Sequence, residues 1–338
     1  MTNSARISYV IVALIFVLIA WLHVGVLVLT VLFGYFALHF LSFGKSKALG
    51  VILYTILVAA IGYGLFYFSR EAYKQLPEIA DKTIPAVVGW AEKNDIALPF
   101  TDYASLKTLA LTKIKERFAN IGIYAREATL LVAMLIIGLV AAVSFFINAK
   151  WEVEDDPEVM KGSLYSTVVR ELVIRFGTFY DSFARVIGAQ IIISTINTAL
   201  TSIFLVWNGF PYATVIVVLT FLCGLLPIIG NILSNTLIVG VAFTMEPNGP
   251  RMALISLIFL VVIHKLEYFL NSKIIGDRIK NPMWLTLIGI VIGEKLMGIP
   301  GMILAPVVLH YIKVEASKNK VVETANETSP TTSSPASK

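Results

Sequence analysis

The chain has 338 residues, of which 57% are hydrophobic and only 14% are charged, and its formal net charge is +5. A soluble domain usually carries about 25% charged residues, so this composition excludes an ordinary soluble protein and indicates membrane spans. The positive charge does not predict nucleic-acid binding, because no basic tract is interleaved with aromatic residues. It fits basic flanks at an anionic membrane surface, so we expect membrane lipid as a partner and no nucleic acid.

Residues 1–68 are predicted to form an N-terminal hairpin and a third span. Residues 7–43 are almost continuously apolar, and one helix of that length would measure about 55 Å, far more than the ~30 Å hydrocarbon core. We therefore expect two helices that meet near Trp21 and His23. Lys45 and Lys47 lie on the short loop before the third span, which places this loop and the N-terminus in the cytoplasm.

Two polar regions flank the fourth span, which is predicted at residues 128–149. Residues 69–127 are expected to form an outer helical loop region that Pro77, Pro85 and Pro99 break into short pieces. Residues 150–185 have helical apolar spacing and are expected to form a cytoplasmic amphipathic helix, which either lies on the membrane or packs on partners.

Residues 186–316 are predicted to form a C-terminal transport core. It contains two apolar segments, 212–245 and 283–316, that are too long for one span and are interrupted by glycine and proline. A backbone broken at membrane depth normally lines a cavity or is buried in protein. Residues at the two breaks are candidates for a substrate path: Pro227, Gly230, Asn231, Gly298, Pro300, Gly301 and Pro306. The tail, residues 317–338, is expected to be disordered and cytoplasmic.

Four polar residues in the span 186–207 recur at helical spacing and share one helix face: Gln190, Ser194, Asn197 and Thr201. Such a face serves either as hydrogen-bonding contact between helices or as the wall of a polar path, and the sequence leaves both open. We include the four residues in the candidate substrate path.

Ionisable residues in an apolar segment are costly, which makes His264 and Glu267 candidates for function. With Asn271 they share one helix face, where a histidine and a carboxylate on adjacent turns can exchange a proton or bind a cation. Asp277 follows in a short polar connector. We expect these four residues to couple transport to an ion or proton; the alternative is an interfacial helix whose charged face meets water.

Enzyme and cofactor motifs are absent from the sequence. It contains no G-x-S-x-G, no H-E-x-x-H and no phosphate-binding G-x-x-x-x-G-K-[ST], and its four histidines are far apart. A single cysteine, Cys223, allows no intrachain disulfide. We therefore predict no catalytic residues, no metal and no cofactor. The expected fold is an all-α polytopic membrane protein with about eight spans, two broken or re-entrant segments and amphipathic helices outside the core.

Three C-terminal motifs together resemble a known family. They are L-L-P-I-I-G-N at 225–231, L-E-Y-F-L-N-S-K-I-I-G at 266–276 and G-I-P-G-M-I-L-A-P at 298–306. In this order they resemble the AI-2E (autoinducer-2 exporter-like, formerly UPF0118) permeases, over about residues 7–316. Two positions depart from the family pattern: Ser272 stands where proline is usual, and Glu294 where a second glycine is usual.

The resemblance implies a multi-pass permease of the cell (inner or plasma) membrane that exports a small polar signal or metabolite such as autoinducer-2. Na⁺(Li⁺)/H⁺ antiport is the alternative activity in the same family. A non-transporting membrane scaffold is the alternative from another class. We expect both termini in the cytoplasm. Apolar surfaces and a long amphipathic helix are compatible with a homo-oligomer.

Overall fold

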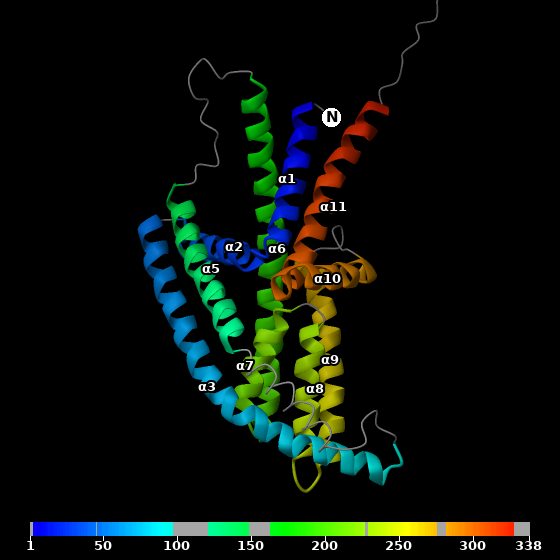
Figure 1. Cartoon of the computed structure of the whole chain (residues 1–338). Coiled ribbons are helices and arrows are strands. Elements are labelled where there is room, and N and C mark those ends of the chain that lie inside the picture. Colours follow the sequence, from blue (N-terminus) through cyan, green and yellow to red (C-terminus); the bar gives the residue numbers. More distant parts are fainter. Residues whose placement is uncertain are drawn as a thin grey trace, which may run out of the picture. The chain divides into compact units, whose positions relative to one another are not determined.

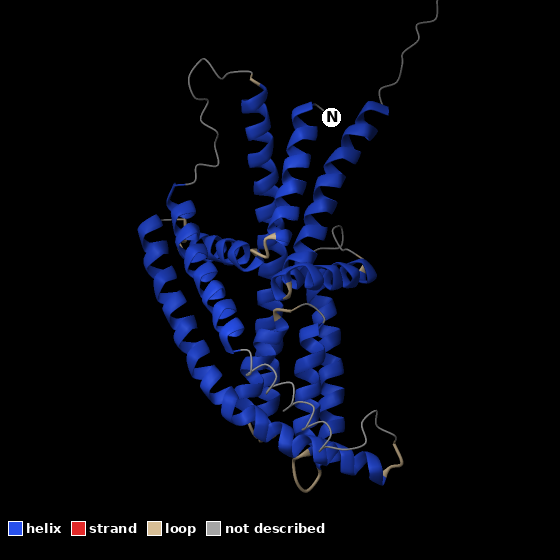
Figure 2. Ribbon diagram, viewed as in Figure 1, coloured by secondary structure: helices blue, strands red, loops and turns tan. Residues whose placement is uncertain are grey.

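The computed structural model describes residues 3–44, 46–96, 121–148, 163–226, 229–275 and 282–327. Within these ranges the chain forms ten α-helices and no strand (Figure 2). Six of these helices are long and apolar enough to cross a membrane, and three shorter apolar helices accompany them. The predicted class, an all-α polytopic membrane protein, is confirmed.

The helices in chain order are α1 (Asn3–Trp21), α2 (Gly25–Leu41), α3 (Lys47–Lys93), α5 (Ile121–Asn148), α6 (Leu164–Trp207), α7 (Ala213–Gly224), α8 (Ile229–Phe243), α9 (Gly249–Ile275), α10 (Met283–Met297) and α11 (Ile299–Glu327) (Figure 1). They belong to two compact units. Unit 1 comprises Met1–Leu22, Trp151–Ile187 and Ile275–Lys338. Unit 2 comprises His23–Lys150 and Gly188–Ile274.

Two sequence-based boundaries are confirmed. The first apolar segment breaks where its length required, since α1 ends at Trp21 and α2 begins at Gly25, with His23 between them at φ 53°. The second overlong segment, 212–245, also divides: α7 ends at Gly224 and α8 begins at Ile229. The amphipathic stretch and the following span form one continuous helix, α6, of 44 residues.

The prediction that Pro77 and Pro85 break the region after the third span is wrong. Both lie inside α3, a single helix of 47 residues that curves along its length (Figure 1). A proline inside a helix costs about 3 kcal/mol, but tertiary packing of the second half of α3 offsets this cost. Ile79 is buried in the main apolar cluster of unit 2, and the Trp90 ring lies 5.2 Å from that of Phe243. Pro99 lies outside the described residues.

Two predictions about the C-terminal helix are also wrong. Pro306 does not interrupt the last apolar segment but lies inside α11, where its neighbours Leu304 and Val307 are buried. The break falls at Gly298, whose φ of 65° favours glycine. The helix then continues to Glu327, so residues 317–327 of the predicted disordered tail are helical, supported by a Glu315–Lys318 pair of 3.0 Å.

In unit 1, α10 and α11 pack with their backbones in contact. A Cβ atom at Gly301 would overlap the carbonyl of Gly293, and one at Gly293 would overlap the carbonyl of Gly301. Small residues at a helix crossing allow this approach, which is typical of membrane helices. Gly298 connects the two helices, so the last apolar segment forms a close helical hairpin.

A buried ionic cluster around Arg175 joins α1, α6 and α11 within unit 1. The side chains of Arg175 and Glu315 are 5% and 8% exposed, and their Nη1 and Oε2 atoms are 3.2 Å apart. Arg175 also donates to Ser8 Oγ at 2.7 Å and to Glu171 Oε2 at 2.9 Å. The Tyr9 hydroxyl donates to Glu315 Oε2 at 3.0 Å, beneath the guanidinium. Each buried charge therefore has several partners.

In unit 2, one apolar cluster holds together the helices that carry the candidate site. Its buried members come from α3, α6, α7, α8 and α9 and from the turn before α7: Ile79, Leu205, Phe210, Ile216, Ile238, Val241, Ala242, Ala253 and Leu260. Phe204 of α6 stacks on Phe259 of α9, with ring centroids 4.1 Å apart. A second cluster, around Leu38, Tyr54 and Ala142, joins α2, α3 and α5.

Removal of Arg175 should destabilise the protein far more than removal of an exposed cation. Arg175→Met leaves the buried carboxylate of Glu315 without one of its two cationic partners. Removal of one partner of a buried pair typically costs about 3–5 kcal/mol. The control is Lys82→Met, because the Lys82–Glu78 pair has side chains 57% and 51% exposed and should contribute little. Thermal unfolding of both variants in detergent measures the difference, and equal losses would contradict a stabilising role of the cluster.

Two glycine-to-alanine substitutions should have opposite effects on stability. Gly301→Ala introduces a methyl group into the backbone of Gly293 and should destabilise by roughly 1–3 kcal/mol or more. Gly62→Ala, in the exposed part of α3, meets no atom within 4 Å and should stabilise its helix by up to ~1 kcal/mol. Denaturation midpoints of the two variants test the crossing; a neutral Gly301→Ala would show that α10 and α11 separate readily.

Candidate functional site

Glu267 of α9 is the centre of a polar cluster inside unit 2. Its Oε2 atom accepts a hydrogen bond from Asn231 Nδ2 of α8 at 2.7 Å and a longer one from Asn197 Nδ2 of α6 at 3.4 Å. His264 Nδ1, one turn earlier on α9, lies 3.7 Å from the same oxygen. The Glu267 side chain is only 14% exposed, so three helices converge on a carboxylate that is largely removed from solvent.

The local fold explains why these side chains meet. His264 and Glu267 are three residues apart on α9 and therefore share a face. Asn231 lies in the first turn of α8, after the interruption between α7 and α8, where the helix dipole also favours a negative charge. The apolar cluster that stacks Phe204 on Phe259 fixes α6 against α9 and brings Asn197 within reach.

Gln190 and Ser194 of α6 bind the end of α7. Gln190 Nε2 donates to the carbonyl of Gly224 at 2.6 Å, and Ser194 Oγ donates to the carbonyl of Phe221 at 3.0 Å. These bonds correspond to the first of the two roles that the sequence left open, contact between helices. A role for the same residues in a substrate path stays a prediction.

The remaining predicted site residues lie in unit 2, outside the described residues, or in unit 1. Thr201 is buried in α6, and Gly230 lies in α8, where a Cβ atom would overlap the Cys223 carbonyl. Asn271 belongs to α9, whereas Pro227 and Asp277 lie outside the described residues. The residues of the second predicted break belong to unit 1: Gly298, Pro300, Gly301 and Pro306. One path formed by both breaks stays a prediction.

The groups around Glu267 offer a carboxylate and an amide oxygen that has no partner among the described residues. Asn197 is 9% exposed, and its side-chain Oδ1 atom is buried without a hydrogen-bond partner among the described residues. Asn197 Oδ1 and the Glu267 carboxylate are oxygen acceptors on neighbouring helices. Among the described residues no group of three or more His, Cys, Asp or Glu side chains could hold a metal ion.

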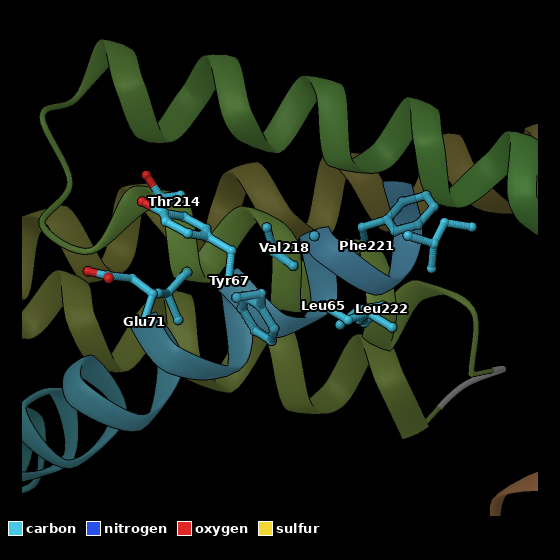
Figure 3. A pocket seen from close by; sticks show the side chains of 11 residues that line it. Leu65, Tyr67, Glu71, Thr214, Val218, Phe221 and Leu222 are labelled. Carbon is cyan, nitrogen blue, oxygen red and sulfur yellow. The ribbon is translucent and has the colours of Figure 1, made fainter. Parts of the chain in front are cut away.

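A separate groove in unit 2 lies between α3 and α7 and has a volume of about 290 Å³. Figure 3 shows Glu71, Tyr67 and Thr214 toward one end of it, and Leu65, Phe221 and Leu222 toward the other. None of the predicted site residues lines this groove, and most of its side chains are apolar. Such a surface fits hydrocarbon rather than a polar solute, so the polar cluster at Glu267 is the better candidate site.

Comparison with known proteins gives the family. A family model described as AI-2E family transporter matches residues 5–318. The chain belongs to the AI-2E transporter family. The resemblance noted in the three C-terminal motifs is thereby confirmed, and the protein is a multi-pass membrane protein of a transporter family.

A curated relative supports the same assignment. "Putative transport protein YdbI" of Bacillus subtilis (strain 168) is 25% identical to this AI-2E family member over 209 residues. The match covers 61% of this chain and 59% of the relative, so the chain spans less than two thirds of the length of that protein.

Proposed function

We propose that this AI-2E family transporter is a permease for a small polar solute and that Glu267 binds the proton or cation that drives it. The observation that carries the proposal is the burial of the Glu267 carboxylate beside His264, Asn231 and Asn197. An ionisable group at such a place is costly and is normally functional.

The geometry supports exchange of a single charge. Ionised Glu267 accepts hydrogen bonds from the two asparagine amides. Neutral Glu267 carries a proton that it can exchange with His264, whose Nδ1 atom lies 3.7 Å from Glu267 Oε2. Binding and release therefore change the hydrogen bonds that hold α8 and α6 to α9. Movement of a broken helix around a central site is the expected form of alternating access.

Two substrate classes follow from the family resemblance. The first is export of a small polar signal or metabolite such as autoinducer-2, whose hydroxyl groups would donate to the carboxylate and to Asn197 Oδ1. The second is Na⁺(Li⁺)/H⁺ antiport, which the Glu267 carboxylate favours, because hard cations prefer oxygen ligands.

Location and orientation belong to the same proposal. We place the protein in the cell (inner or plasma) membrane with both termini in the cytoplasm, because the short sequence between the second and third spans is basic, with Lys45 and Lys47. Lys47 also donates to the carbonyl of Ile147 at 2.8 Å, so the end of α5 lies beside the start of α3. Exposed apolar side chains on the spanning helices are compatible with a homo-oligomer.

Glu267→Gln should abolish the pH dependence of transport while leaving downhill flux. Glutamine keeps the shape and the neutral charge of the protonated acid but cannot exchange a proton. Purified protein in proteoliposomes is assayed for autoinducer-2 flux, and for Na⁺- and Li⁺-induced pH changes with an internal dye, between pH 5 and 9. The matched control is Glu294→Gln at the exposed end of α10, which should behave as wild type.

Each outcome of this assay has a distinct meaning. Unchanged pH dependence in Glu267→Gln would remove Glu267 from the coupling role. Autoinducer-2 flux without Na⁺-dependent pH change identifies the exporter, and the reverse identifies the antiporter. The scaffold alternative predicts no flux of either kind in wild type.

A further inference from the structure

The last carbonyl groups of α7 are satisfied in an unusual way. The final four carbonyls of a helix have no partner within the helix. At the end of α7, Leu222 O accepts from Leu225 N at 3.3 Å and Cys223 O from Leu226 N at 2.8 Å, so the chain tightens locally. The two other carbonyls accept hydrogen bonds from side chains of α6. Phe221 O accepts from Ser194 Oγ, and Gly224 O accepts from Gln190 Nε2.

An end of this kind cannot rely on water if it lies at membrane depth. A backbone polar group without a partner costs several kcal/mol in hydrocarbon, so an interrupted helix requires donors from its neighbours. The approach of α6 is close, since a Cβ atom at Gly224 would overlap Ser194 Oγ. Two side chains of α6 therefore bind the C-terminal end of α7 directly.

The same chain segment leads directly to the carboxylate site. After the break, Gly230 N donates to Leu226 O at 3.3 Å, and Gly230 packs on the Cys223 carbonyl. Asn231, the next residue, donates to Glu267 at 2.7 Å. Asn197, one turn beyond Ser194 on α6, reaches the same oxygen. One face of α6 therefore sets both the end of α7 and one bond to Glu267.

We propose that Gln190 and Ser194 are positioning residues that fix the break between α7 and α8 and thereby hold Asn231 against Glu267. This inference rests on the proposed function of Glu267. Neither residue needs to touch the substrate. His264 is the titratable group beside Glu267 in the described part of unit 2, and both substitutions leave it in place.

Cys223 provides a built-in reporter, because it is the only cysteine of the chain and lies in the last turn of α7. Gln190→Met removes the donor but keeps the side-chain length, and Ser194→Ala removes the hydroxyl. The control is Ser202→Ala on the same helix, because the Ser202 hydroxyl donates to Thr198 O within α6. A second control is Ser194→Thr, which keeps a hydroxyl at that position. The thermal stability of each variant is measured first, and the variants as stable as wild type are reconstituted and treated with maleimide.

The expected result has two parts. Loss of one hydrogen bond at the break should speed Cys223 labelling about two- to tenfold in Gln190→Met and Ser194→Ala, with Ser202→Ala at the wild-type rate and Ser194→Thr close to it. The same two variants should shift the pH midpoint of flux, because Asn231 no longer holds its bond to Glu267. Together these results support the positioning role.

Two other results would overturn it. Wild-type labelling in both donor variants would show that the break does not depend on α6. Faster labelling with an unchanged pH midpoint would show that the two residues stabilise the break without positioning Asn231. Failure of the proposed function is recognised separately, since Glu267→Gln then retains pH-dependent flux whatever the labelling rates are.

Discussion

The hydrocarbon core of a bilayer contains no water that could hydrogen-bond to an exposed peptide group or hydrate a charge. Every interruption of a helix and every ionised side chain at membrane depth therefore needs a partner supplied by the protein. The end of α7 obtains donors from Gln190 and Ser194, and Glu267 obtains them from two asparagines. The positions of these polar side chains follow from that requirement, and the candidate site is built from them.

Glu315 and Glu267 differ in how fully their charge is compensated. Glu315 in unit 1 contacts Arg175 and Lys318, so its negative charge is matched by permanent cations. Glu267 in unit 2 meets two neutral amides and a histidine that is charged only when protonated. A fully paired acid serves structure, because separating the pair costs several kcal/mol. Glu267 is therefore the acid that we propose for the transport cycle.

Several features were predictable from the sequence because they depend on local chemistry. The length of the apolar segments required the breaks after Trp21 and near Pro227, and Glu267 was conspicuous as an acid in an apolar helix. The expectation that Pro77, Pro85 and Pro306 interrupt their helices was wrong. Tertiary packing decides whether a proline ends a helix, and here it involves Ile79, Trp90 and Val307. Hydrogen bonding between helices was one of the two roles that the sequence predicted for Gln190 and Ser194. Their acceptors could not be predicted, since these are backbone carbonyls, which have no residue signature.

The crossing of α10 and α11 has a mechanical consequence. Where Gly293 meets Gly301, peptide groups touch without any side chain between them, and no rotamer change can absorb a displacement. Sliding of one helix along the other would drive backbone atoms into each other. The pair is therefore stiff against shear, and any rearrangement that involves it should carry both helices as one piece.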